Sequence, residues 1–152
     1  MVEGERGIHR SDTMTNRWLE RALIASPHLT LCLSAKAFKK ACKHVHFPKP
    51  YPFWLPDDAD AVVHSLEDGS TKPSITIVCI EPLPRRVSDV SSILAHEAVH
   101  VYEVVKSQNP SIQWNEEELA AHSIGLITAR LIEDYLRQVG RKDSIKAIRR
   151  GR

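Results

Sequence analysis

The chain has 152 residues, enough for about one domain with a buried core. Its contents of 42% hydrophobic and 26% charged residues are ordinary for a folded globular protein. A net charge of +2 is too small to argue for a nucleic-acid partner, and no apolar run is long enough to cross a membrane. Cys32, Cys42 and Cys79 show no paired spacing, so we expect buried, reduced thiols. The function must therefore be sought in the motifs.

The N-terminal region divides into an extension and the start of a single domain. Residues 1–13 are polar and lack the apolar segment of a secretory signal, so we expect a flexible extension on a cytoplasmic protein. Apolar residues at helical spacing predict a helix over residues 15–25, within a domain that spans residues 14–140. Met14 is an alternative start for the natural chain.

A strand, a helix and a loop are predicted next. Residues 29–33 have the pattern of a short strand, and Ser34 is placed to cap a helix over residues 35–43. Residues 46–56 are rich in proline and aromatic residues, which excludes regular structure. We expect a loop that is either pinned by its aromatic side chains or forms one wall of a substrate cleft.

Two further strands are predicted before the central part of the chain. Residues 59–67 and 74–80 are rich in apolar and β-branched residues, and the segment between them contains Asp68-Gly69 and Pro73. This arrangement is typical of an antiparallel hairpin.

The run from Val87 to Lys106 predicts a long helix with two distinct faces. Ser88 or Asp89 is the expected N-cap. At 100° per residue, one apolar stripe is formed by Val90, Leu94, Ala98, Val101 and Val105. His96 and His100 lie outside this stripe, so the helix is expected to have a core face and a separate face with two histidines.

His96, Glu97 and His100 form the motif H-E-x-x-H, whose spacing has a mechanical reason. Residues four apart lie one turn apart on the same helix face, so both imidazoles can bind one Zn²⁺. Glu97 projects to the same side and can act as general base toward a metal-bound water. The motif is typical of zinc-dependent peptidases and predicts Zn²⁺ as the cofactor.

A catalytic zinc needs a third protein ligand, which the acidic segment 115–118 is expected to supply at the start of a second helix that reaches about Val139. The helical phase puts both Glu117 and Glu118 toward the buried half. Small residues on the face of Glu118 favour it modestly over Glu117, because they allow close approach of the first helix. A purely structural explanation for Glu118 is that it forms a capping box with Asn115.

The same phase predicts which sides of the second helix are buried and exposed. The buried face is expected to contain Ala121, His122, Gly125 and Ala129. The solvent side is expected to contain Ser123, Arg130, Glu133, Asp134 and Arg137.

Two segments of the chain resemble the small zincin-like metallopeptidases encoded by tailed bacteriophages and prophages. They are His-Glu-Ala-Val-His-Val-Tyr at 96–102 and Glu-Leu-Ala-Ala-His-Ser-Ile at 118–124, and softer similarity extends the resemblance over residues 14–140. The family pattern joins H-E-x-x-H on one helix to E-x-x-A-Y on the next. His122 stands where the family has tyrosine, which leaves the role of that tyrosine without a match.

The resemblance implies a site and a fold. His96 and His100 would be zinc ligands, Glu97 the catalytic base and Glu118 the third ligand. The fold would be α+β, a minimal zincin-like domain in which a small antiparallel or mixed sheet packs on two long helices that carry the zinc. An edge strand of the 59–80 hairpin would then pair with an extended peptide substrate.

Further roles follow from this expectation. The developing oxyanion would need another donor, for which His122, Tyr102 and His64 are candidates. The alternative function is that of a phage structural or assembly protein in which zinc stabilises the fold without catalysis, and a fourth ligand such as His122 would indicate it. The partners would then be a peptide or protein substrate, or phage structural proteins, in the host cytoplasm or in the virion.

The C-terminal end is strongly basic. Gly140 is expected to end the second helix, and residues 141–152 form the predicted basic tail. The tail is either solvated or a site of electrostatic contact with nucleic acid or an acidic partner. Nucleic-acid binding is not expected elsewhere in the chain.

Overall fold

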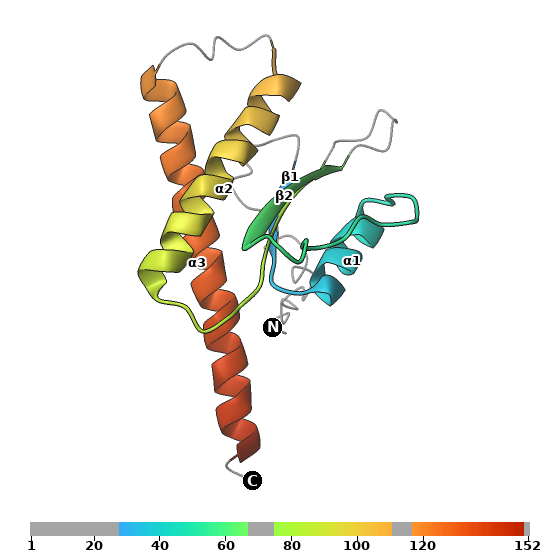
Figure 1. Cartoon of the computed structure of the whole chain (residues 1–152), viewed down its shortest axis with the longest axis vertical. Coiled ribbons are helices and arrows are strands. Elements are labelled where there is room, and N and C mark those ends of the chain that lie inside the picture. The colour runs from blue at the N-terminus through green and yellow to red at the C-terminus, as the bar shows by residue number, and fades with distance from the viewer. Residues whose placement is uncertain (1–27, 67–74, 111–116, 151–152) are drawn as a thin grey trace, which may run out of the picture.

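A computed structural model describes residues 28–66, 75–110 and 117–150. Side chains are described for residues 29–66, 75–110 and 117–140. The elements are β1 (His28–Cys32), α1 (Ala35–His44), β2 (Ala61–Leu66), β3 (Ile75–Ile80), α2 (Val87–Gln108) and α3 (Glu117–Arg150). Figure 1 shows the α+β arrangement that was predicted, with a small sheet between one short helix and two long ones. The predicted extension over residues 1–13, the helix over 15–25 and the turn of the hairpin lie outside the described residues.

The three strands form a mixed sheet in the order β1-β3-β2. β2 and β3 pair antiparallel, with Val63 opposite Val78, which confirms the predicted hairpin pairing. β1 pairs parallel to β3 on the other side, with Leu31 also opposite Val78. Every residue of β3 is buried, as expected for a continuous apolar run in the centre of a sheet.

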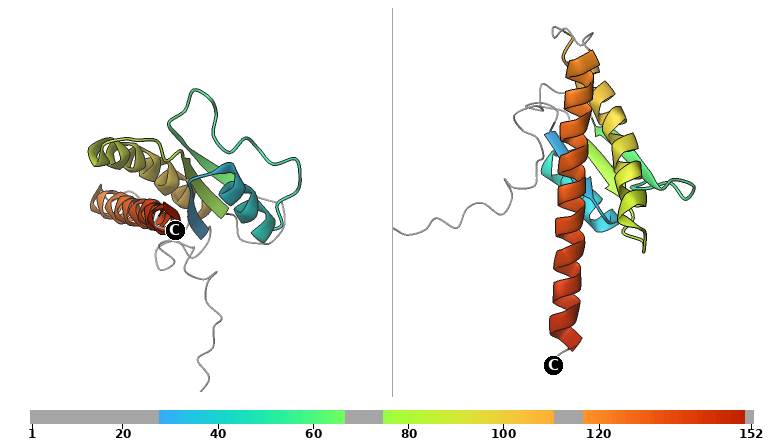
Figure 2. Two further views of the ribbon diagram at one scale, coloured as in Figure 1. Left: turned by 90° about the horizontal axis from the view of Figure 1, so that it is seen from below. Right: turned by 90° about the vertical axis from the view of Figure 1, so that its left-hand side faces the viewer.

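Two apolar clusters cover the two faces of the sheet. On one face, Leu31 and Val78 pack with α2 and α3. On the other face, Ile77 and Cys79 pack with Phe38 of α1. Side chains along a strand alternate between faces, so β3 contributes to both clusters. In Figure 2, α2 and α3 lie together on one side of the sheet and α1 lies on the opposite side.

The cysteines and the cap of α1 agree with the sequence analysis. Cys32, Cys42 and Cys79 are buried and form no disulfide within the described part of the chain, and desolvation raises the pKa of the Cys42 and Cys79 thiols. Ser34 caps α1, because its hydroxyl accepts a hydrogen bond from the backbone N–H of Ala37 at 3.2 Å.

α2 begins at Val87 as predicted, but its N-cap differs from the prediction. The N-cap is Arg86, without a side-chain cap, rather than Ser88 or Asp89. The cap lies two to three residues before the predicted one because Asp89 and Val90 both donate their backbone N–H to the Arg86 carbonyl. Asp89 instead lies in the first turn, where a carboxylate complements the helix dipole.

The end of α3 also differs. The helix does not stop at Gly140 but continues to Arg150, so the basic segment begins as helix rather than as an irregular tail. A glycine ends a helix when it adopts a left-handed conformation, and Gly140 has no such φ value. Within a helix it costs only about 1 kcal/mol relative to alanine, which is too little to end the helix by itself.

The predicted phase of α3 is wrong in part. Arg130, Glu133 and Arg137 are exposed as expected, but Ser123 and Asp134 are buried. The small-residue face is exposed, and it consists of Ala121, His122, Gly125 and Ala129. The helix instead buries the stripe of Ile127, Leu131 and Tyr135. Large side chains remove more apolar area from water than alanine or glycine does, so they decide which side faces the sheet.

Gln138 joins α3 to the edge strand β1 and also contacts the buried carboxylate of Asp134. Gln138 donates from Nε2 to Asp134 Oδ2 at 2.7 Å and to the backbone carbonyl of Leu31 at 3.1 Å. Arg137 also pairs with Asp134. These contacts satisfy a buried charge and occupy an acceptor on the outer edge of β1.

None of the helices in the described ranges combines the length and the apolar character needed to span a lipid bilayer.

We expect Gln138→Leu to lower the free energy of unfolding by about 1 to 2 kcal/mol, because Asp134 and the Leu31 carbonyl each lose a donor while the packing volume is kept. Urea unfolding measures this change. Glu133→Ala is the matched control, since Glu133 is exposed on the same helix and its surface ion pair with Arg130 contributes little. Equal stability of the two variants would show that the Gln138 contacts do not hold β1 to α3.

Candidate metal centre

The candidate metal centre begins with the two exposed histidines in the middle of α2. The helix buries Val90, Leu94, Ala98, Val101 and Val105, which confirms the predicted apolar stripe. His96 and His100 lie beside this stripe and are exposed, as their helical phase predicted.

The two imidazoles converge on one point. Nε2 of His96 and Nε2 of His100 are 3.1 Å apart, and the rings meet edge to face with centroids 4.8 Å apart. Two nitrogens bound to the same tetrahedral zinc at about 2.0–2.1 Å would lie roughly 3.3 Å apart. The separation also suits an N–H···N hydrogen bond between neutral rings of opposite tautomer. The side chains therefore need only a small movement to bind one ion.

Glu97 lies between the histidines along the helix and is 6% exposed. Burial raises the pKa of its carboxyl group, while His100 and His96 act in the opposite direction. A raised pKa makes the carboxylate a better proton acceptor, which is the direction that a general base requires.

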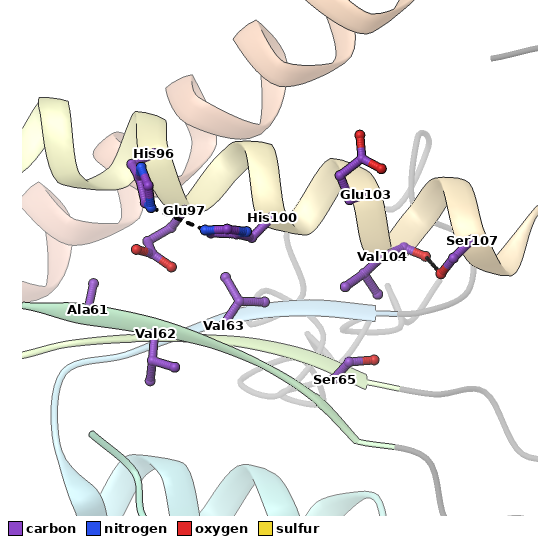
Figure 3. Close-up of a pocket in the computed structure, with 10 residues that line it drawn as sticks. All are labelled: Ala61, Val62, Val63, Ser65, His96, Glu97, His100, Glu103, Val104 and Ser107. Carbon is purple, nitrogen blue, oxygen red and sulfur yellow. Dashed lines mark hydrogen bonds between the residues drawn. The ribbon is translucent and has the colours of Figure 1, made fainter. Parts of the chain in front are cut away.

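The site faces an edge strand across a pocket of about 620 Å³. One wall is α2, which contributes His96, Glu97, His100, Glu103, Val104 and Ser107. The other wall is β2, which contributes Ala61, Val62, Val63 and Ser65. Figure 3 shows the Glu97 carboxylate directed from α2 toward β2, with Val63 opposite His100.

An ion pair connects the two walls at one end. Arg85, just before α2, donates to Asp60, just before β2, at 2.8 Å. Arg85 is largely covered, with 14% of its side chain exposed, whereas Asp60 is mostly open to water. The pair joins the starts of the helix and the strand that form the pocket.

The structure does not bring Glu118 to the two histidines. Glu117, Glu118 and His122 are all exposed on α3. Among the described residues, no three His, Cys, Asp or Glu side chains gather closely enough to hold a metal ion. The possible capping partner Asn115 lies outside the described residues.

Two other candidate residues point elsewhere. Tyr102 is 4% exposed and belongs to the core between α2, α3 and the sheet. His64 lies on the opposite face of β2 from the pocket, where its ring packs against Phe38 and its Nε2 is 3.1 Å from the carbonyl oxygen of Trp54. In this arrangement, neither side chain reaches the His96–His100 pair.

Sequence reasoning missed several residues of the pocket. Glu103 and Ser107 follow His100 at spacings of three and seven, so the helical repeat could have placed them on the histidine face. Ala61, Val63 and Ser65 alternate along β2, but only the tertiary structure shows which alternate set faces α2. The aromatic loop over residues 46–56 contributes no residue to this pocket and packs in part against the α1 side of the sheet.

No protein-family model, curated protein or solved structure matches this chain.

We expect Glu97→Gln to change how the stability of the metal-free protein depends on pH. Because burial raises the pKa of Glu97 in the folded chain, the folded state favours the protonated carboxyl group. The stability of the wild type relative to Glu97→Gln should therefore be greatest below the pKa of the unfolded chain and fall as the pH rises through the folded pKa. Urea unfolding after EDTA treatment, between about pH 4 and about pH 7.5, measures the difference. A difference independent of pH would show that Glu97 is not desolvated.

Proposed function

We propose that the chain is a zinc-dependent metallopeptidase of the zincin-like kind, with His96 and His100 as ligands and Glu97 as general base. The single observation that carries this proposal is the convergence of the two Nε2 atoms to 3.1 Å beside a buried glutamate that faces a pocket. Zinc supplies a polarised carbonyl and a bound water of lowered pKa.

The residues of the chain would then share the work of amide hydrolysis. Glu97 takes a proton from the attacking water and later gives it to the leaving amine. The raised pKa of Glu97 suits both transfers, because the group can hold the proton between them. β2 lies at the edge of the sheet and forms the opposite wall, so an extended peptide can pair with its outer side.

Glu118 is the third ligand that the resemblance implies, and its exposed position on α3 gives it no geometric support. We keep it in the proposal because a catalytic zinc requires three protein ligands. Binding of the ion by Glu118 would require α3 to move relative to α2, or the start of α3 to repack. The assignment is open to a direct comparison with Glu117.

Zinc content separates the roles of the motif residues. We expect about one Zn²⁺ per chain in the wild type, loss of zinc in His96→Ala, and retention in Glu97→Gln with at least a hundredfold loss of peptide hydrolysis. Elemental mass spectrometry and cleavage of a mixed peptide library measure the two properties. Zinc binding with no hydrolysis by the wild type would leave the non-catalytic, zinc-stabilised role. No zinc in the wild type would remove the proposal.

The third ligand is tested by a matched pair. We expect Glu118→Ala to weaken zinc binding by more than tenfold and Glu117→Ala to leave it unchanged, since the neighbouring carboxylates differ by only one helical position. Competition with a zinc chelator measures both affinities. Loss of affinity in Glu117→Ala alone would assign the ligand to Glu117, and unchanged affinity in both would exclude this acidic segment.

A further inference from the structure

α3 carries a second apolar surface that the core covers only in part. We name it the α3 seam, and it consists of Gly125, Ala129, Ile132, Leu136 and Val139. Its positions alternate at spacings of four and three, which keeps them on one line along a helix. Leu136 is 49% exposed, and Gly125 and Ala129 are also exposed.

The seam lies far around the helix from the sheet. At 100° per residue, its centre is turned by roughly 120° from the buried stripe of Ile127, Leu131 and Tyr135. A Cβ atom added at Gly125 would meet nothing within 4 Å, so packing in a single chain does not explain this helical glycine. Ile132 and Val139 are only partly covered by the core.

α3 also extends beyond the rest of the domain. It has 34 residues and is about 50 Å long, whereas α2 has 22 residues. Figures 1 and 2 show its C-terminal part running past the sheet and past α2, with no other described element beside it. Within the described part of the chain, the exposed seam residues Gly125, Ala129 and Leu136 are therefore accessible to a partner.

The charges at the two ends of α3 are opposite. The first turn contains Glu117 and Glu118. Residues 141–150 contain five Lys or Arg and one Asp. Two copies in antiparallel orientation would place each acidic end beside the basic end of the partner, while a parallel pair would place like charges together.

We propose that two copies of this chain associate through the α3 seam as an antiparallel helix pair. In an antiparallel pair the midpoints of the two α3 helices, near residue 134, lie side by side. Ile132 and Leu136 flank this midpoint, so they form the centre of the contact. The small residues Gly125 and Ala129 let the partner helix approach closely. The charge pattern selects a second copy over nucleic acid, since a nucleic acid would contact only the basic end and leave the apolar centre in water. This proposal is independent of the zinc site.

The test measures the mass of the full chain in solution by light scattering during size-exclusion chromatography. We expect a species of twice the 17.2 kDa of one chain at micromolar concentration, and at least a tenfold weaker dimer in Leu136→Glu. The matched control is Val99→Glu, an exposed valine on α2 that should leave the dimer unchanged. Circular dichroism establishes that both variants are folded. A wild type that is monomeric at all concentrations, or equal weakening by both variants, would overturn the proposal.

The dependence on salt tests the orientation. The antiparallel pair should weaken as NaCl rises, because salt screens attraction between the acidic and basic ends. Arg149→Glu combined with Arg150→Glu should also weaken it. A dimer strengthened by salt would mean like charges lie together and would overturn the antiparallel arrangement. Salt-sensitive binding of a DNA duplex by a chain that stays monomeric would assign the basic end to nucleic acid instead.

Discussion

Burial of β3 on both faces is the constraint on which the rest of the structure depends. All six of its residues are buried, which requires α1 to cover one face of the sheet and α2 and α3 to cover the other. The apolar stripe of α2 therefore packs on the sheet face that α1 does not cover. In this position the histidine face of the helix lies beside β2. The pocket is thus a by-product of covering a small sheet with a helix whose apolar stripe is narrow.

Much of the fold could be predicted from the sequence, because local patterns were strong where large apolar residues repeat. The antiparallel hairpin, α1 with its Ser34 cap and the buried stripe of α2 are examples. α3 was harder, because it has apolar or small residues on more than one side. Its rotation about the helix axis depends on which of these sides buries the most apolar area against the sheet. Ser123 and Asp134 are buried because they lie beside the stripe of Ile127, Leu131 and Tyr135.

The candidate site shows the same division between local and distant information. The His96–His100 pair follows from a spacing of four within one helix, so the sequence predicts its geometry. Glu118 belongs to another helix, and its distance from that pair depends on how α3 rotates and slides against α2. His64 illustrates a third case, because alternation along β2 places it on either face and only the register with β3 decides which.

The two edges of the sheet differ in how they are closed. At β1, Gln138 of α3 donates a hydrogen bond to the backbone carbonyl of Leu31, so this acceptor on the edge strand already has a partner. Neither β1 nor β2 has a further described strand on its outer side. A further strand added at β1 would have to displace Gln138 from the Leu31 carbonyl, so elongation of the sheet by a ligand or a misfolded neighbour is favoured at β2. Crowding would therefore first produce aggregation by addition of a strand at β2.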